Sequence, residues 1–83
     1  MMDSQPTQAT DPSVKLVRMA NQISDYFAAY PHDKAVKQTR EHIEQFWAPP
    51  MRLAIKAHLA QGGKGLKPIS SEAVGGLHPV KVS

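Results

Sequence analysis

The chain has 83 residues, a net charge of +3 and no cysteine. This length allows one small domain, which buries only about 60–65% of the surface exposed by its unfolded chain and is therefore marginally stable alone. The lack of cysteine excludes disulfides and thiolate metal sites, which leaves a partner protein as the expected supplement and fits a cytoplasmic location. No apolar run approaches the ~20 residues of a membrane span, and the N-terminus has no secretory-signal pattern, so we expect no membrane partner.

The first predicted helix follows a polar segment. Residues 1–10 show no apolar periodicity and are predicted to be a disordered lead. Asp11 can cap a helix whose first position suits Pro12, and the helix is expected to end at Tyr30, because Pro31 disfavours a helical residue before it. The apolar stripe of this helix consists of Leu16, Ala20, Ile23, Phe27 and Tyr30.

A second and a third helix are predicted on either side of a proline break. Asp33 is expected to cap the second helix, which ends at Ala48-Pro49-Pro50. Pro50 then suits the first turn of the third helix, and Gly62–Gly63 is expected to close it, because glycine adopts the left-handed conformation without strain. The short loops favour antiparallel packing of the first two helices.

Beyond the third helix the apolar pattern weakens. It indicates one short helical segment, capped by Ser70 or Ser71 and ended by Gly75–Gly76. No internal repeat or convincing strand is found. We therefore predict an all-α fold, with a helical hairpin and a third helix after the proline break. Residues 11–74 are expected to form a single small helical domain, and residues 75–83 a flexible tail.

No pattern typical of an enzyme is present, and no catalytic, cofactor-binding or metal-binding residue is assigned. The run 62–65 (Gly-Gly-Lys-Gly) lacks the spacing of a phosphate-binding loop. The histidines are too far apart for a local zinc pair, so His42 is interpreted as a hydrogen-bonded, partly buried residue and His58 as a donor near a helix C-terminus. Glu41 and Glu44 are expected to belong to a salt-bridged outer face.

The candidate partner surface centres on the run His42–Arg52, which contains the only tryptophan. Aromatic residues, methionine and arginine are enriched in interface cores and hot spots. For Trp47 and Arg52, partner contact and packing in the chain's own core both remain open. Phe27 is expected in the core, and Tyr26 at the surface or in an interface. The predicted partner-binding residues are Tyr26, His42, Phe46, Trp47, Pro49, Met51, Arg52 and His58.

The basic residues gather in the C-terminal half. Residues 50–83 hold five basic residues and one acid. Such an excess can face nucleic acid or an acidic protein surface, although five scattered charges are a weak footprint for nucleic acid. A solvated surface is therefore the main interpretation. A stand-alone basic regulator that binds nucleic acid or an acidic protein surface is the alternative function.

The order and spacing of several segments point to a known family. These segments are Leu16–Ile23, Phe27–Pro31, His42–Ile43, Phe46–Trp47, Pro49, Met51–Arg52, His58–Leu59, Gly62–Gly63 and Gly65–Pro68. Together they resemble the delta subunit of bacterial NAD-dependent formate dehydrogenase over about residues 14–74. The family usually has Asp-Pro-Arg-Met-Arg after the tryptophan, whereas this chain has Ala48–Arg52 (Ala-Pro-Pro-Met-Arg), so a salt bridge at that turn is not implied. Phe-Phe is common in the family where Tyr26 and Phe27 stand.

The resemblance implies a non-catalytic subunit of an oxidoreductase complex. Complexes of this family oxidise formate to carbon dioxide and pass electrons through iron–sulfur clusters and FMN to NAD. A molybdenum or tungsten pterin lies in their large alpha subunit. The implied role of this chain is to dock on the alpha subunit and to support assembly, stability or cofactor loading. It would itself bind no cofactor and no nucleic acid.

Overall fold

The computed structural model describes residues 12–80, and the predicted disordered lead of residues 1–10 lies outside this range. No strand occurs between residues 12 and 80, so the predicted all-α fold is confirmed. No helix in this range is long and apolar enough to cross a bilayer. The helices are α2 (Pro12–Phe27), α3 (His32–Phe46), α4 (Pro49–Ala60) and α5 (Pro68–Gly75).

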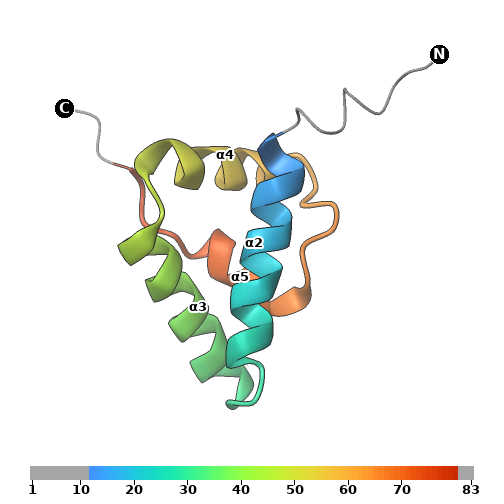
Figure 1. The fold of residues 1–83 in the computed structure, drawn as a ribbon, viewed down its shortest axis with the longest axis vertical. Helices are drawn as coiled ribbons and strands as arrows, with labels where there is room; N and C mark the ends of the chain where they lie inside the picture. Colours follow the sequence, from blue (N-terminus) through green and yellow to red (C-terminus); the bar gives the residue numbers. More distant parts are fainter. Residues whose placement is uncertain (1–11, 81–83) are drawn as a thin grey trace.

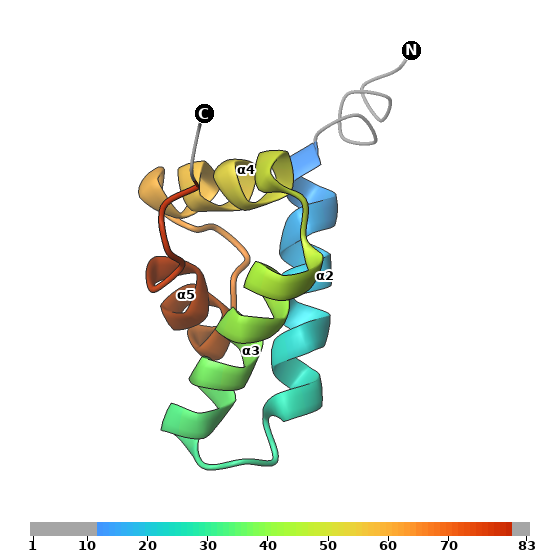
Figure 2. The same ribbon diagram turned by 90° about the vertical axis from the view of Figure 1, so that its left-hand side faces the viewer.

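Helices α2 and α3 form a V, and α4 closes its wide end (Figure 1). Helices α2 and α3 run in opposite directions, meet at the short turn between them and splay apart. Helix α4 lies across the open end, and α5 lies inside the V beside α3 (Figure 2). Helix α5 packs against all three other helices, so the shortest helix holds the arrangement together.

The turn between α2 and α3 differs from the sequence prediction. Helix α2 ends at Phe27, before the predicted end at Tyr30, and the Tyr30 N–H donates to the Phe27 carbonyl at 3.0 Å. Helix α3 then begins at His32, after an extended Pro31. The predicted Asp33 cap is wrong, because Pro31 is the N-cap and Asp33 lies inside the first turn of the helix. A carboxylate there still interacts favourably with the helix dipole.

The glycine stop after α4 is confirmed. The Gly62 N–H donates to the Leu59 carbonyl at 3.0 Å, and the Gly63 N–H donates to the His58 carbonyl at 3.0 Å. Both glycines have positive φ, 117° and 65°. A Cβ on Gly63 would lie 2.8 Å from Leu59 Cδ1. The turn therefore needs glycine at this position for its conformation and for its space.

Helix α5 begins without the predicted serine cap. Lys67 is its N-cap and Pro68 follows in the first turn, so proline rather than serine marks the start. Ser70 is completely buried inside the helix. Its hydroxyl donates to the Ala20 carbonyl at 3.2 Å and hydrogen-bonds the Ser24 hydroxyl at 2.9 Å. This serine therefore joins α5 to α2, which the capping prediction missed.

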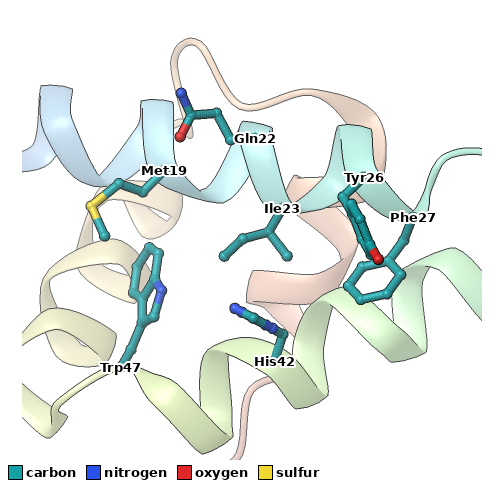
Figure 3. Close-up of a pocket in the computed structure, with 7 residues that line it drawn as sticks. All are labelled: Met19, Gln22, Ile23, Tyr26, Phe27, His42 and Trp47. Atoms are coloured by element: carbon teal, nitrogen blue, oxygen red, sulfur yellow. The ribbon is translucent and has the colours of Figure 1, made fainter.

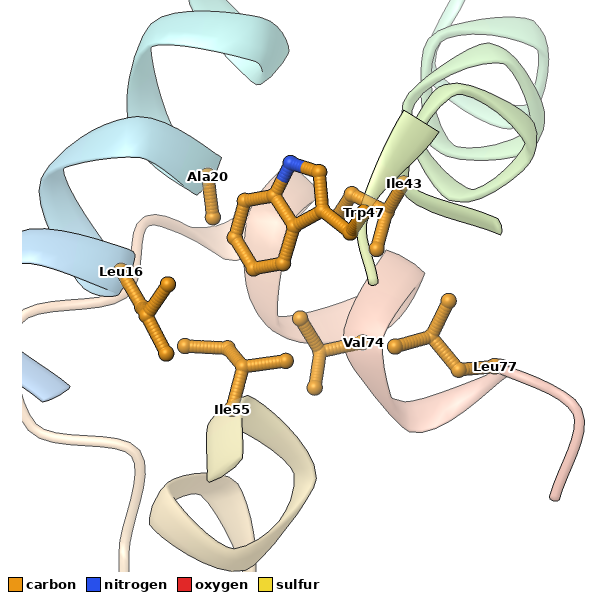
Figure 4. Packing of buried hydrophobic residues seen from close by; sticks show 7 residues of the cluster. All are labelled: Leu16, Ala20, Ile43, Trp47, Ile55, Val74 and Leu77. Atoms are coloured by element: carbon orange, nitrogen blue, oxygen red, sulfur yellow. The ribbon is translucent and has the colours of Figure 1, made fainter. Parts of the chain in front are cut away.

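Trp47 lies in the middle of the core and is only 5% exposed. Its indole packs among aliphatic side chains from all four helices and from the segment that follows α5 (Figure 4). Of the two interpretations left open for Trp47, core packing is therefore observed. The buried cluster comprises Leu16, Ala20, Ile43, Trp47, Ile55, Val74 and Leu77.

The packed part of the chain extends past residue 75, where we expected a tail to begin. Leu77 is 4% exposed and belongs to the core. Its carbonyl accepts a hydrogen bond from Lys56 Nζ at 3.1 Å. The His78 N–H donates to Glu44 Oε2 at 2.9 Å, and its ring Nδ1 lies 2.6 Å from the same oxygen. The segment after α5 is thus fixed to α3 and α4; residues 81–83 lie outside the described range.

The surroundings of Glu44 lower the pKa of its carboxyl group. Partial burial acts to raise the pKa of this carboxyl. The two hydrogen bonds from His78 and the nearby charges of His78 and Arg40 outweigh burial, so the pKa of Glu44 is lowered from its ordinary value of 4.5. Glu44 therefore pairs with the C-terminal segment, whereas the sequence suggested an outer salt-bridged face.

Candidate partner-binding site

A groove of about 530 Å³ lies between α2 and α3 (Figure 3). Its α2 wall is a second stripe beside the core stripe, in which Met19, Ile23 and Tyr26 follow one another at three- and four-residue steps. Trp47 and His42 form the opposite side. We call this hollow the aromatic groove; it is lined by Met19, Gln22, Ile23, Tyr26, Phe27, His42 and Trp47.

Rings extend from the aromatic groove onto the surrounding surface. The Phe27 and His42 ring centroids are 6.4 Å apart, and those of His42 and Phe46 are 4.7 Å apart. Tyr26 packs edge-on against Phe27 at 5.0 Å. Tyr26 and Phe46 remain 78% and 69% exposed, respectively. Large aromatic side chains left in water beside an apolar groove mark a surface suited to binding.

The aromatic groove also contains polar groups without protein partners. The Trp47 indole N–H, the His42 ring and the Gln22 amide make no hydrogen bond to residues 12–80. The Trp47 nitrogen lies on the edge of the indole that is turned toward His42, on the same side of the groove (Figure 3). A bound group would therefore meet apolar walls and several hydrogen-bonding atoms, which is the usual composition of a specific binding site.

A second groove, of about 460 Å³, adjoins the first at Met19, which lines both. Lys15 is the charged residue on its wall, and no acidic residue lines either groove. Together the two hollows follow α2 for most of its length. We call the second hollow the proline groove; it is lined by Pro12, Lys15, Leu16, Met19, Pro50, Met51 and Ala54.

The structure brings five of the predicted partner-binding residues to these grooves. Tyr26, His42 and Trp47 line the aromatic groove, and the Phe46 ring packs at a tilt against His42 at its edge. Met51 lines the proline groove. The hydrogen bond expected for His42 is absent among the described residues, and ring contacts with Phe27 and Phe46 take its place.

The other three predicted residues lie apart from the grooves. Pro49 is exposed in the first turn of α4. Arg52 is half-buried, and its Nε has no hydrogen-bond partner in the described part of the chain. His58 forms a hydrogen bond through Nε2 with the Lys64 carbonyl at 2.8 Å, and so supports the turn after α4. This contact agrees with the interpretation of His58 as a hydrogen-bond donor near the C-terminus of a helix.

Sequence reasoning identified Tyr26 on the α2 wall of the site but missed the rest of that wall. Met19 and Gln22 were not identified, and Ile23 was assigned to the core stripe alone. The spacing of Met19, Gln22 and Tyr26 contains the relevant pattern, because these positions fall on one helical face. The stronger stripe of Leu16 and its neighbours obscured it.

The basic residues of the C-terminal half are partly used by the fold. Lys67 Nζ lies 2.9 and 3.0 Å from the two carboxylate oxygens of Asp25. Lys56 bonds the Leu77 carbonyl. Lys81, which contributes to the basic excess, lies outside residues 12–80.

Titratable residues form pairs in the described structure. His32 Nε2 lies 2.6 Å from Glu72 Oε2, and His78 pairs with Glu44. Within residues 12–80, no three side chains of His, Asp or Glu come close enough to hold a metal ion.

The fold and the grooves define a small all-α protein with exposed aromatic side chains beside an apolar groove. A family model shows more specifically that the chain belongs to the NADH-dependent formate dehydrogenase delta subunit family, FdsD, with residues 15–74 matched. The match confirms the resemblance found in the sequence and includes nearly all residues of both grooves. Comparisons with curated proteins and with solved structures gave no match.

Proposed function

We propose that this chain is a non-catalytic accessory subunit that docks on the alpha subunit of a bacterial NAD-dependent formate dehydrogenase. In this proposal it supports the assembly, stability or cofactor loading of that complex. Family membership supports the association with a formate dehydrogenase. The observation that carries the docking proposal is the aromatic groove with Tyr26 and Phe46 exposed beside it.

The exposed aromatic side chains give docking a driving force. Tyr26 and Phe46 contribute little to the chain's own core, since most of each side chain faces water. Burial of a large apolar side chain against a partner contributes about 1.5–3 kcal/mol. Trp47 would take part from the side of the groove opposite α2, through the edge of its ring and its indole N–H, while remaining a core residue.

The redox cofactors belong to other subunits in this proposal. A chain without cysteine lacks the usual thiolate ligands of an iron–sulfur cluster. The pterin and its molybdenum or tungsten, the clusters and FMN would therefore be held elsewhere in a cytoplasmic complex. The contribution of this chain is mechanical, because it covers and holds a surface of the alpha subunit.

The test is co-purification from cells that express the complete complex. The double variant Tyr26→Ala/Phe46→Ala should reduce recovery of the alpha subunit at least about tenfold, because two anchors are lost. Val14→Ala is the matched control, since Val14 is 47% exposed and lines neither groove. Both variants should keep the circular dichroism spectrum of the parent chain. Normal recovery with Tyr26→Ala/Phe46→Ala would place the docking face elsewhere.

The stoichiometry of the same purification separates two roles. Equal amounts of this chain and the alpha subunit in the active enzyme indicate a resident subunit. Recovery only with an alpha subunit that lacks its pterin indicates an assembly factor. Recovery of nucleic acid without any dehydrogenase subunit would favour the alternative of a basic regulator.

A further inference from the structure

We infer that the element of the partner that fills the two grooves is a single amphipathic α-helix with a carboxylate near Lys15. This inference rests on the proposed docking function and specifies the chemistry of the docked segment. The aromatic groove and the proline groove meet at Met19, so one continuous element can occupy both. Lys15 lines one end of this track and Tyr26 the other.

The length of the track suits about three helical turns. Lys15 and Tyr26 lie on the same helix, eleven residues apart, which corresponds to about 16 Å along its axis. A helix of about eleven residues spans the same distance. Its apolar side chains at steps of three and four residues would match the steps of Met19, Ile23 and Tyr26 on the opposite wall.

The backbone of the groove walls favours a helix over an extended segment. The walls belong mainly to α2, α3 and α4, whose main-chain groups are largely engaged in intrahelical hydrogen bonds. An extended peptide of about five residues over the same 16 Å would bring about ten main-chain polar groups into this apolar track. The side chains of Gln22, His42 and Trp47 are too few to satisfy them. A helix makes its main-chain hydrogen bonds internally, so these three groups stay available to the side chains of the partner helix.

The charge of the track favours an acidic end on the helix. Lys15 is the charged lining residue, and neither Lys15 nor the neighbouring Arg18 forms an ion pair with residues 12–80. Because neither groove has an acidic lining residue, a carboxylate on the partner would be attracted by Lys15 without repulsion from the groove lining. We therefore place an aspartate or glutamate of the partner helix at the Lys15 end.

Photo-crosslinking in the assembled complex tests this geometry. Lys15 and Tyr26 are each replaced by p-benzoylphenylalanine in the full chain, which is co-expressed with the other dehydrogenase subunits. Crosslinked peptides are then identified by mass spectrometry. If the partner segment is a helix, the two crosslinked sites should lie about eleven residues apart in one segment. If it is extended, they should lie about five residues apart. Lys37, exposed and outside both grooves, is the control position and should not crosslink to that segment.

The possible outcomes separate this inference from the docking proposal. Sites about five residues apart, or sites in two unrelated segments, would overturn the helix while leaving docking intact. Crosslinks between two copies of this chain would show that a second copy fills the track. An intact complex without crosslinks from either groove position would overturn both the inference and the proposed face.

The acidic end has a test of its own. Lys15→Glu should weaken recovery of the alpha subunit about five- to tenfold at low salt, and the difference should shrink at high salt, where charges are screened. Lys37→Glu makes the same charge change outside the grooves and should leave recovery unchanged. Equal effects of the two variants would show that overall charge, and no carboxylate near Lys15, is responsible.

Discussion

Two neighbouring aromatic residues, Phe46 and Trp47, should respond very differently to truncation. Trp47 is 5% exposed in the centre of the core, whereas Phe46 is 69% exposed. Replacement of a buried tryptophan by alanine costs about 3–5 kcal/mol, from lost apolar burial and the cavity left behind. The free energy of unfolding of a domain this small is about 4–10 kcal/mol at typical values per residue. Trp47→Ala should therefore remove a large share of the stability.

Thermal unfolding of the full chain, followed by circular dichroism, measures the difference. At about 4–8 °C per kcal/mol for a domain of this size, Trp47→Ala should lower Tm by at least about 12 °C.

 Phe46→Ala, the adjacent and matched control, should shift Tm by less than about 4 °C, because an exposed side chain contributes within about 0.5 kcal/mol. Trp47→Phe should fall between the two, since it keeps most of the apolar volume. Similar shifts for Trp47→Ala and Phe46→Ala would refute the assignment of Trp47 to the core.

Two further predictions concern the turn after α4 and the segment after α5. Gly63→Ala should lower the free energy of unfolding by about 1–3 kcal/mol, because Gly63 has a φ of 65° and its new Cβ would lie 2.8 Å from Leu59 Cδ1. Gly75→Ala, whose Cβ would meet only an ordinary contact at 3.6 Å, is the control in urea denaturation and should change stability by less than about 0.5 kcal/mol; equal losses would contradict the prediction. Because the pKa of Glu44 is lowered, its carboxylate contributes its full stabilisation at pH values above the ordinary pKa of 4.5. This contribution is lost as the pH falls through the lowered pKa. Glu44→Gln should therefore reduce stability at pH 7 more than at pH 3 in urea denaturation, and an equal loss at both pH values would show that the charge has no part in it.

Local sequence patterns were sufficient for the helices and for most of their breaks. The proline break before α4 and the glycine stop after it follow from backbone restrictions that act within a few residues. Helix starts were less well predicted. Asp33 and Ser70 are both residues that favour caps, but Pro31 and Pro68 set the starts of α3 and α5, so the two side chains lie inside the helices.

The sequence alone thus determined an all-α chain, its helix-breaking positions and its family. Only the tertiary structure decided which aromatic residue enters the core. Helix α3 ends at Phe46, and Trp47 has an extended backbone with φ −89° and ψ 136°. The helical period therefore no longer fixes the direction of the Trp47 side chain, which depends on how the chain turns into α4. The grooves have the same origin, because their walls come from α2, α3 and α4 and exist only once these helices have packed.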